Sequence, residues 1–292
     1  MRSDPRDYEF SSPGTLAGAL SLLNREPGQW LPVAGGTEVM VQYSSGRLDA
    51  RRMLNLWDIQ ELKQITEGAD SLRIGGGCTF AQIREHSAVQ KYFPLLAKAA
   101  ALTGSIANQN RATIAGNIVN ASPAADSPPA LLVHEAELEL VSTAGTRRIS
   151  YGDFHLSYKK TALKPNELLL AIHLPKRFVK WFSYCQKTGA RNAQAISKVC
   201  IAGIGKLSGG RVETVHLALG AVAPIPLRLR KTEKVLLDAE LTKHTVAEAQ
   251  RALAGEISPI EDIRSSAEYR RQVAANLLED LLESFAASEC GQ

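Results

Sequence analysis

The segment 113–126 restricts the fold more than any other part of the sequence, because few core-building segments are so rich in small and polar residues. It reads Thr-Ile-Ala-Gly-Asn-Ile-Val-Asn-Ala-Ser-Pro-Ala-Ala-Asp and lies between a helix-like pattern that ends near Leu102 and a strand-like pattern that begins near Leu131. Small residues together with Asn and Asp allow backbone amides to close around an anion. Long connections of this kind usually carry function, so we expect a ligand-binding loop here.

An upstream segment, 31–39, has matching chemistry. Its sequence is Leu-Pro-Val-Ala-Gly-Gly-Thr-Glu-Val, in which Gly35 and Gly36 permit unusual backbone dihedral angles and can direct N–H groups at a phosphate. A Gly-Gly pair between two apolar runs is also compatible with a plain tight turn. Taken together and in this order, the two segments predict a phosphate cradle built from two loops.

At these two segments the chain resembles the FAD-binding subunits of molybdenum hydroxylases, the family of xanthine dehydrogenase and its aldehyde, nicotinate and carbon monoxide relatives. The family's first flavin loop reads Ala-Gly-Gly-Thr-Asp/Glu, as residues 34–38 do here. Its second loop reads Thr-Ile-Gly-Gly-Asn-Ile-Ala-Asn-Ala-Ser-Pro-Ala-Gly-Asp-Ser, from which this chain departs only at Ala115, Val119 and Ala125. The likeness extends along nearly the whole chain.

The resemblance implies an α+β fold in two parts, divided at Pro175-Lys176-Arg177. Residues 1–176 would form a two-lobed FAD-binding domain of the vanillyl-alcohol-oxidase or PCMH type, with lobes at about 1–58 and 59–176. Residues 177–292 would form a small C-terminal α+β domain of the CO-dehydrogenase-flavoprotein type, with an antiparallel sheet and helices. A length of 292 residues with 45% hydrophobic content is sufficient for two cores.

The resemblance also implies roles for individual residues. Residues 33–38 would wrap the FAD pyrophosphate, residues of the second loop would complete that cradle, and Asp126 would hold ribityl or ribose hydroxyls. Backbone amides suit a diphosphate, and a carboxylate suits sugar hydroxyls. The implied cofactor-binding residues are Val33, Ala34, Gly35, Gly36, Thr37, Glu38, Gly104, Thr113, Gly116, Asn117, Val119, Asn120, Ala125, Asp126, Leu169 and Lys187.

Three residues outside the two loops have competing interpretations. By resemblance, Leu169 is the apolar contact of the isoalloxazine, whereas Tyr158 and Lys187 lie near the flavin edge and its electron acceptor. A lysine beside the pyrimidine end of the ring would stabilise anionic reduced flavin. From the sequence alone, Leu169 reads as a buried strand residue, and Tyr158 and Lys187 read as surface groups.

The function implied by the resemblance is electron transfer. Substrate hydroxylation would take place at the molybdenum cofactor of a large partner subunit, and electrons would cross the 2Fe-2S clusters of a small partner subunit to the FAD of this chain. The acceptor would be NAD or another oxidant: Tyr158 favours a pyridine nucleotide, but Gln194 replaces an acidic residue of some NAD-reducing members. FAD would be bound noncovalently, because no histidine stands near residues 34–38. The mechanism requires no acid or base from this chain.

Two other classes of function remain open. A free-standing flavin oxidase acting on a small molecule would need a substrate pocket with a base near the flavin, and no candidate base is evident. An assembly module that has lost flavin would have an eroded cradle, yet the glycines, Asn117 and Asp126 are present. The FAD content of the purified chain distinguishes the assembly module from both flavoprotein classes.

Composition argues against several partners and sites. The formal net charge of +4 is small and the basic pairs are scattered, so no nucleic-acid partner is expected. No apolar stretch reaches roughly 18 residues and the first residues lack the apolar centre of a signal peptide, so we expect no membrane span and a cytoplasmic location. Cys78, Cys185, Cys200 and Cys290 are far apart and form no Cys-x-x-Cys pair, so no metal site is predicted.

Hydrophobic periodicity predicts the individual elements. The predicted helices are 15–23 with a cap at Ser12-Pro13, 79–86, 94–102, one from about Thr245, and a final helix with Val273, Leu277, Leu278, Leu281, Leu282 and Phe285 on one face. The predicted strands are one from about Leu72, the hairpin 137–142 and 146–149, 167–174, and the hairpin 200–219. The Gly-Gly-Gly of residues 75–77 imitates a phosphate loop but lacks its Lys-Ser/Thr, so we assign it a structural role.

Overall fold

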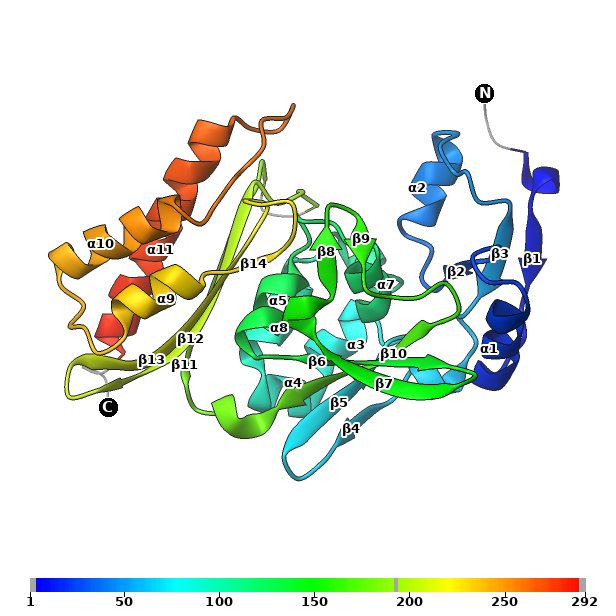
Figure 1. The fold of residues 1–292 in the computed structure, drawn as a ribbon, viewed down its shortest axis with the longest axis horizontal. Helices are drawn as coiled ribbons and strands as arrows, with labels where there is room; N and C mark the ends of the chain where they lie inside the picture. The colour runs from blue at the N-terminus through cyan, green and yellow to red at the C-terminus, as the bar shows by residue number, and fades with distance from the viewer. Residues whose placement is uncertain (1–3, 192–193, 289–292) are drawn as a thin grey trace.

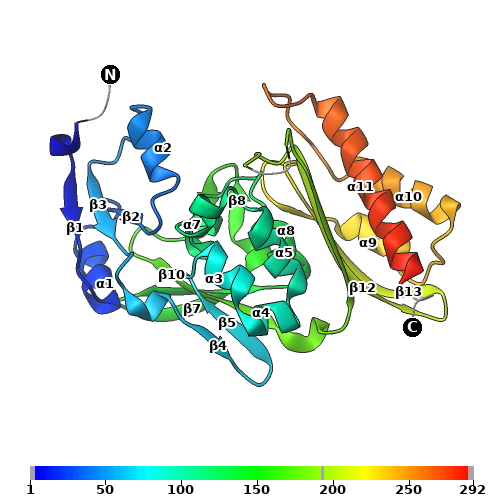
Figure 2. The same ribbon diagram turned by 180° about the vertical axis from the view of Figure 1, so that it is seen from behind.

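The computed structural model describes residues 4–191 and 194–288, which form three bodies arranged in a row (Figures 1 and 2). A small N-terminal lobe and a C-terminal domain flank a larger central lobe. Three clusters of buried hydrophobic side chains underlie these bodies. Helices and strands are mixed throughout, so the α+β prediction is confirmed.

The N-terminal lobe is built on a parallel three-stranded sheet in the order β1-β3-β2. Its elements are β1 (Glu9–Ser11), α1 (Leu16–Arg25), β2 (Leu31–Val33), α2 (Val39–Ser44) and β3 (Arg52–Asn55). The predicted cap of α1 is wrong by one turn: Thr15 caps the helix, because its side-chain oxygen accepts the amide of Gly18. Leu20 of α1 belongs to the same buried cluster as Leu168 of the central sheet, and this shared core joins the two lobes.

The central lobe contains an antiparallel five-stranded sheet in the order β4-β5-β10-β6-β7, packed against short helices. Its strands are β4 (Ile65–Glu67), β5 (Ser71–Gly75), β6 (Glu137–Ser142), β7 (Gly145–Ser150) and β10 (Leu168–Pro175). Its helices are α3 (Phe80–Glu85), α4 (Ser87–Tyr92), α5 (Pro94–Leu102), α6 (Ile106–Gln109), α7 (Ile114–Val119) and α8 (Ser127–Val133). A short ribbon of β8 (His155–Ser157) and β9 (Lys160–Thr161) lies beside α7 (Figure 1). The hairpin predicted at 137–142 and 146–149 and the strand predicted at 167–174 are confirmed.

The prediction of a strand near Leu131 is wrong, because residues 127–133 form α8. Pro128 and Pro129 occupy the first turn, where a missing N–H costs nothing and a fixed φ favours the helix. Every residue of α8 is buried, and a continuous apolar run does not distinguish a buried helix from a buried strand. The segment 113–126 is also more than a loop, since α7 lies within it.

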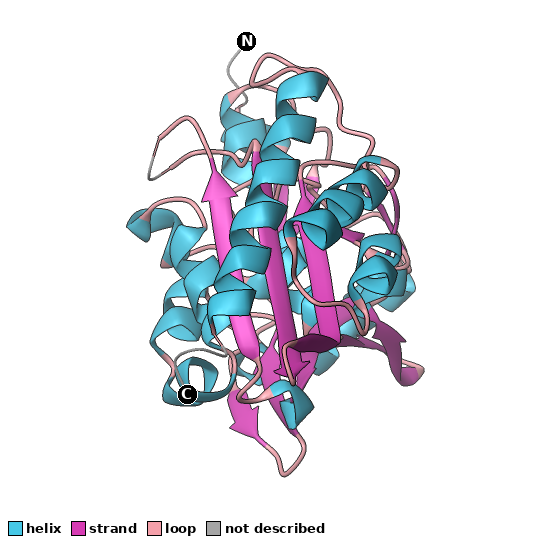
Figure 3. Ribbon diagram, turned by 90° about the vertical axis from the view of Figure 1, so that its left-hand side faces the viewer, coloured by secondary structure: helices cyan, strands magenta, loops and turns pink. Residues whose placement is uncertain are grey.

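The C-terminal domain is an antiparallel sheet in the order β11-β12-β13-β14 with helices on one face (Figure 3). Its strands are β11 (Phe182–Thr188), β12 (Val199–Ser208), β13 (Arg211–Gly220) and β14 (Leu227–Arg228), and its helices are α9 (Arg230–Leu236), α10 (Lys243–Ala254) and α11 (Ala267–Ala287). The predicted 200–219 hairpin and final helix are confirmed, and the apolar face of α11 packs on its own sheet. Strands β11 to β13 also contact α5 and α8 of the central lobe.

Residues 75–77 have the predicted structural role. The amide of Gly76 donates to the carbonyl of Leu170 and the amide of Gly77 donates to the carbonyl of Leu62, both at 2.8 Å. A Cβ atom on Gly76 would lie 2.4 Å from the carbonyl oxygen of Leu169, so the backbones are too close for any side chain. These amides are therefore unavailable to a ligand.

The described residues contain neither a membrane-spanning helix nor a group of side chains that could hold a metal ion. None of the helices formed by residues 4–191 and 194–288 is long and apolar enough to cross a membrane. Over the same residues, no group of His, Cys, Asp and Glu side chains is arranged to hold a metal ion. Cys78, Cys185 and Cys200 are buried free thiols, and Cys290 lies outside the described residues.

Candidate functional site

Loop 1, residues 33–38, connects the end of β2 to the start of α2. The backbone amides of residues 35–39 donate to no acceptor within the described part of the chain, although those of Met40 and Val41 are bonded to loop carbonyls. Gly36 adopts a φ of +75°, a left-handed conformation that glycine tolerates best. Apart from the exposed Glu38, these residues are half-buried. Loop 1 therefore contains five consecutive backbone amides that have no acceptor among the described residues.

Loop 1 lies directly against the residues that precede the second loop. A Cβ atom on Gly35 would lie 1.8 Å from the carbonyl oxygen of Arg111 and 3.1 Å from the Cα of Ala112. The Arg111 side chain donates through Nε to the carbonyl of Gly35 at 3.4 Å, and its guanidinium lies 3.8 Å from the ring centroid of Trp57. Glycine at position 35 is thus required by a backbone-to-backbone contact between the lobes.

Loop 2, residues 113–126, has its amides engaged by the protein. The amides of Ile114 and Ala115 donate to the carbonyls of Cys78 and Gly76 at 3.0 Å, and that of Gly116 donates to the Thr113 hydroxyl oxygen at 3.2 Å. Its side chains differ in their exposure: Thr113 is buried, whereas Val119 is exposed beside the exposed backbone of Gly116. To a ligand, loop 2 therefore offers a rigid surface and its side chains, whereas few of its backbone amides are free.

The side-chain amide of Asn117 has a divided role. Its Oδ1 accepts the hydroxyl of Ser127 at 2.7 Å, which ties α7 to the first turn of α8. Its Nδ2 group has no hydrogen-bond acceptor among the described residues. An asparagine carries two N–H donors on this nitrogen, so both remain available beside loop 2.

The turn between β8 and β9 brings a third segment to the loops. Lys159 donates through Nζ to the carbonyl of Asn120 at 2.7 Å and to its Oδ1 at 3.0 Å. Partial burial lowers the pKa of Lys159, and the nearby Glu38 carboxylate opposes that shift. The preceding residue, Tyr158, is 61% exposed, as the surface interpretation expects. Lys159 therefore connects loop 2 electrostatically with loop 1.

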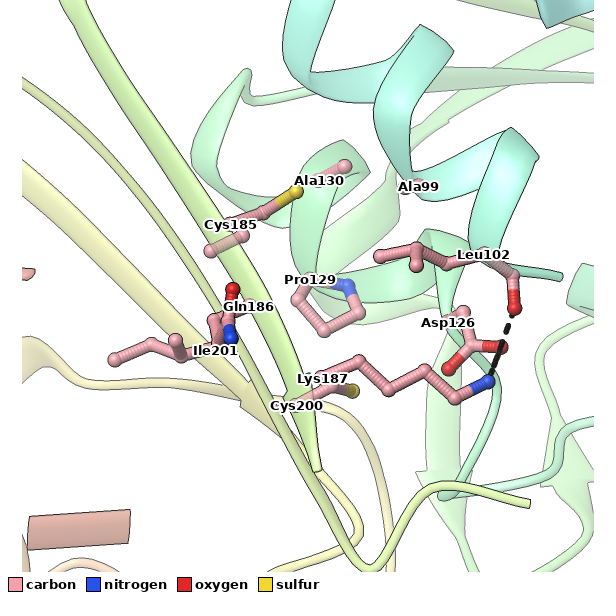
Figure 4. Close-up of a pocket in the computed structure, with 11 residues that line it drawn as sticks. Ala99, Leu102, Asp126, Pro129, Ala130, Cys185, Gln186, Lys187, Cys200 and Ile201 are labelled. Carbon is pink, nitrogen blue, oxygen red and sulfur yellow. Dashed lines mark hydrogen bonds and ion pairs between the residues drawn. The ribbon is translucent and has the colours of Figure 1, made fainter. Parts of the chain in front are cut away.

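Asp126, at the end of loop 2, forms a buried ion pair with Lys187 of β11 (Figure 4). Lys187 Nζ donates to Asp126 Oδ2 at 2.6 Å and to the carbonyl of Leu102 at 3.0 Å, and Ser197 Oγ donates to Asp126 Oδ1 at 2.5 Å. Burial raises the pKa of Asp126, and the Lys187 charge opposes this shift. Both side chains of the pair are only 10% exposed, so the interpretation of Lys187 as a surface group is wrong.

The tail of loop 2 is held by the C-terminal domain. The amide of Ala221 donates to the carbonyl of Pro123 at 2.7 Å, and the Cys200 thiol donates to the carbonyl of Ala125 at 3.9 Å. A Cβ atom on Gly220 would lie 2.6 Å from Cys200 Sγ, so the strands are packed closely here. The cavity beside Asp126 and Lys187 measures about 10 Å³, room for at most one water. An aromatic cofactor ring must therefore lie outside this packed seam.

The remaining predicted residues have simpler environments. Leu169 is buried in the core of the central lobe, at an irregularity in the pairing of β10 with β6. Gly104 has a φ of +61° in the turn between α5 and α6. Gln194 is exposed, and its carbonyl accepts from the Arg191 side chain at 2.6 Å. The candidate site thus joins the two loops to the β8–β9 turn and the start of the C-terminal domain.

Sequence reasoning missed three residues of this site: Arg111, Lys159 and Ser197. Arg111 immediately precedes the small-residue run and Lys159 follows Tyr158, so proximity to singled-out residues is the only signal in the sequence. Ser197 is separated from Asp126 by 71 positions. No local pattern could have connected those two residues.

Comparisons with known proteins match the chain along nearly its whole length. Residues 6–177 match the family model described as FAD binding domain in molybdopterin dehydrogenase, and residues 184–285 match the CO dehydrogenase flavoprotein C-terminal domain. The chain is 31% identical to the xanthine dehydrogenase FAD-binding subunit of Escherichia coli O157:H7, over 98% of this chain and 99% of that protein. It is 27% identical to the carbon monoxide dehydrogenase medium chain of Hydrogenophaga pseudoflava, over 96% and 97% of the two chains. Its fold matches reconstituted CO dehydrogenase from Oligotropha carboxidovorans with a TM-score of 0.93, at 25% identity and over 98% and 99% of the chains.

Proposed function

This chain belongs to the FAD-binding family of molybdopterin dehydrogenases, and from that membership we propose that it binds FAD noncovalently and serves as the electron-transfer subunit of a molybdenum hydroxylase. Its curated relatives are subunits of oxidoreductases. One observation carries the proposal: the amides of residues 35–39 have no acceptor in the described chain, and they belong to a loop that packs at Gly35 on Arg111 and Ala112, just before loop 2. Successive free amides of this kind form an anion-binding concavity.

The residues at the site fit a flavin dinucleotide. Gly35 allows the backbone of loop 1 to approach Arg111 and Ala112 just before loop 2, and the free amides of loop 1 suit a diphosphate. The Nδ2 of Asn117 offers further donors from loop 2. Asp126 and Lys187 supply a paired carboxylate and ammonium at the far end of loop 2. Bound FAD supplies the ability to accept electrons singly and to release them as a pair. The protein's own task is to hold that group, set the charge around it and restrict access to it.

The names of the relatives support a proposal for the partner subunits of this chain. Several relatives are named medium chains, and we extend to this protein a large partner subunit with the molybdenum cofactor and a small partner subunit with 2Fe-2S clusters. We further propose NAD or another soluble oxidant as the acceptor, for which the exposed ring of Tyr158 offers a stacking surface. In this assignment residues 1–176 form the FAD-binding domain and residues 177–292 the domain that closes it.

The cofactor proposal is tested by titrating the purified full chain with FAD and measuring bound flavin per chain. We expect one FAD per chain, released intact on denaturation because no covalent bond is formed. Gly35→Ala should weaken this binding, and Gly152→Ala serves as its matched control, because a Cβ atom at position 152 has its nearest neighbour at 3.6 Å. A parent chain that is folded but takes up no FAD would falsify the proposal.

The partner proposal needs a separate experiment. The tagged full chain, expressed in its native host, should copurify with polypeptides that contain molybdenum and iron, and the assembly should reduce an acceptor when given an organic substrate. Recovery of the FAD-loaded chain alone, with substrate oxidation that needs no other polypeptide, would instead favour a free-standing flavin oxidase.

A further inference from the structure

Ser197 is a buried side chain at the seam of the two domains. It is 1% exposed and lies in the connection between β11 and β12, where its hydroxyl donates to Asp126 Oδ1 at 2.5 Å. Its position is fixed through the next residue: the amide of Lys198 donates to the carbonyl of Thr188 at 2.8 Å, and the carbonyl of Lys198 accepts from Arg270 Nη1 at 2.7 Å. The hydroxyl is therefore held in place by the C-terminal domain.

The other oxygen of Asp126 is bonded to Lys187. The Lys187 ammonium has three N–H donors, of which one goes to Asp126 and one to the carbonyl of Leu102. The third has no acceptor among residues 4–191 and 194–288. This leaves one N–H of a nearly buried lysine available to a ligand at the edge of the site.

The charge balance around Asp126 depends on few groups. Lys187 on β11 is the cation that faces it in the described structure, and the thiols of Cys185 on β11 and Cys200 on β12 lie close by. Burial raises the pKa of both thiols, to about 11 for Cys185, so both are neutral near neutral pH. Lys98 of α5 acts on Cys185. Burial favours protonation of Asp126, and the bonds from Lys187 and Ser197 oppose it.

We propose that Ser197 is a positioning residue that holds the Asp126 carboxylate, in its charged form, against Lys187, and thereby limits the positive charge that Lys187 presents to the flavin. This inference rests on the proposed function, since it requires FAD at the site. Removing the hydroxyl withdraws a hydrogen bond from the carboxylate, which then takes up a proton more readily. The Lys187 charge then becomes uncompensated.

The expected effect is on the reduction potential of bound FAD. Reduction by two electrons and one proton leaves one additional negative charge on the flavin, so an uncompensated cation nearby favours the reduced form. Ser197→Ala should therefore shift the midpoint potential to more positive values. Because the change acts through protonation of Asp126, the shift should grow as the pH is lowered.

The experiment uses the full chain loaded with FAD and titrated with a reductant in the presence of a reference dye, at mildly acidic and at neutral pH. Ser197→Ala should raise the midpoint potential, more at mildly acidic than at neutral pH, because the Lys187 charge is then less compensated. Ser197→Thr keeps the hydroxyl and should restore the parent potential. Ser183→Ala, at an exposed serine of β11, the strand that carries Lys187, should leave the midpoint potential unchanged.

Two further variants test the charge balance without relying on Ser197→Ala alone. Asp126→Asn should raise the potential, and Lys187→Met should lower it, because they remove opposite members of the pair. Adding Ser197→Ala to Asp126→Asn should cause no further shift, since Ser197 acts through that carboxylate. A loaded Ser197→Ala protein whose potential equals that of the parent at every pH overturns the inference and leaves the FAD proposal intact. A parent chain that binds no FAD overturns both.

Discussion

Loop 1 and loop 2 are built from the same kinds of small residue, yet their backbone amides are in opposite states. The amides of residues 35–39 are unbonded in the described structure, whereas those of Ile114, Ala115 and Gly116 are bonded to acceptors of the chain itself. The first loop is held by contact with the second, and the second is held by the central sheet and by the C-terminal domain.

This difference separates two tasks that look alike in the sequence. A donor that is already bonded to the protein stabilises the fold and offers little to an anion, whereas an unbonded, half-buried donor offers a ligand its full strength. Loop 1 therefore serves as the donor set and loop 2 as the rigid wall against which it is aligned. Damage to loop 2 or its support should appear first as lost stability, and damage to loop 1 as lost FAD.

The largest effect is expected from the support beneath loop 2. Gly76→Ala places a Cβ atom 2.4 Å from the carbonyl oxygen of Leu169 and 2.9 Å from the Cβ of Ala115, both in packed positions. We expect the free energy of unfolding to fall by at least about 3 kcal/mol, the upper end of the usual cost of overpacking a core. Urea denaturation of the chain without FAD measures this loss.

The control for Gly76→Ala is Gly152→Ala, whose new Cβ atom meets nothing closer than 3.6 Å. That variant should differ from the parent by less than about 1 kcal/mol. Equal stability of the Gly76→Ala protein and the control would remove the argument that residues 75–77 act as a fixed support.

Acid should destabilise the loop 2 side through His134. This residue caps α8, the helix that follows loop 2, and burial lowers its pKa to about 4 while its Nδ1 donates to the carbonyl of Ala130. Between about pH 4 and pH 6.5, His134 is neutral in the native state and protonated in the unfolded state. Its contribution is therefore complete above the unfolded pKa of about 6.5 and is lost as the pH falls toward about 4, a change of about 3 kcal/mol.

The measurement is the free energy of unfolding across this pH range for the parent and for His134→Phe. Phenylalanine is suitable because the imidazole already packs edge-on against Phe93 and Phe178. The variant should lose most of that pH dependence, and the remainder should include the contributions of the buried His155 and the partly buried His216. An unchanged slope in the variant would show that His134 does not contribute to the acid sensitivity.

Loop 1 is tested by Gly35→Ala. The added Cβ atom would meet the Arg111 carbonyl at 1.8 Å, so loop 1 must move away from loop 2 and its amides lose their alignment. We expect FAD to bind about a hundredfold more weakly, or about 3 kcal/mol, with most of the fold retained. Flavin titration and circular dichroism on the same sample separate the two quantities; an unchanged FAD affinity would refute the placement of the donor set.

Asn117 tests whether loop 2 also provides ligand donors. Asn117→Ala removes both the acceptor for Ser127 and the free Nδ2, and should weaken FAD binding about tenfold. Asn117→Asp keeps the acceptor and replaces the donors with a negative charge. If Nδ2 faces the diphosphate, the aspartate variant binds FAD more weakly than the alanine variant; parent-like affinity of Asn117→Asp would assign Asn117 to the wall alone.

The sequence predicts those helices and strands whose signals lie within a few neighbouring residues. The helices at α1, α5 and α11 and the two hairpins follow from periodicity and turn residues, because each is determined over a few neighbouring positions. The strand expected at Leu131 failed because α8 is buried on all sides, and such a segment has no polar face to reveal its period.

The state of the site depends on contacts that the sequence does not encode locally. The two loops could be singled out by their glycines and small residues, but whether their amides are free depends on carbonyls of Gly76 and Cys78 about 40 positions away. Lys187 reads as a surface lysine until Asp126 is placed beside it, 61 positions distant. Ser197 has no distinguishing pattern at all, and only the fold gives it a partner.

The C-terminal domain holds the end of loop 2 by hydrogen bonds, and this has a consequence for the order of folding during synthesis. Ribosomes release the chain from its N-terminus, so loop 1 and Asp126 emerge before Lys187, Ser197 and Ala221 have been synthesised. A nascent chain that stops short of β11 has the donor set but lacks Lys187, Ser197 and Ala221, which fix the end of loop 2. We therefore expect stable flavin binding only after the C-terminal domain has been synthesised and has folded against the end of loop 2.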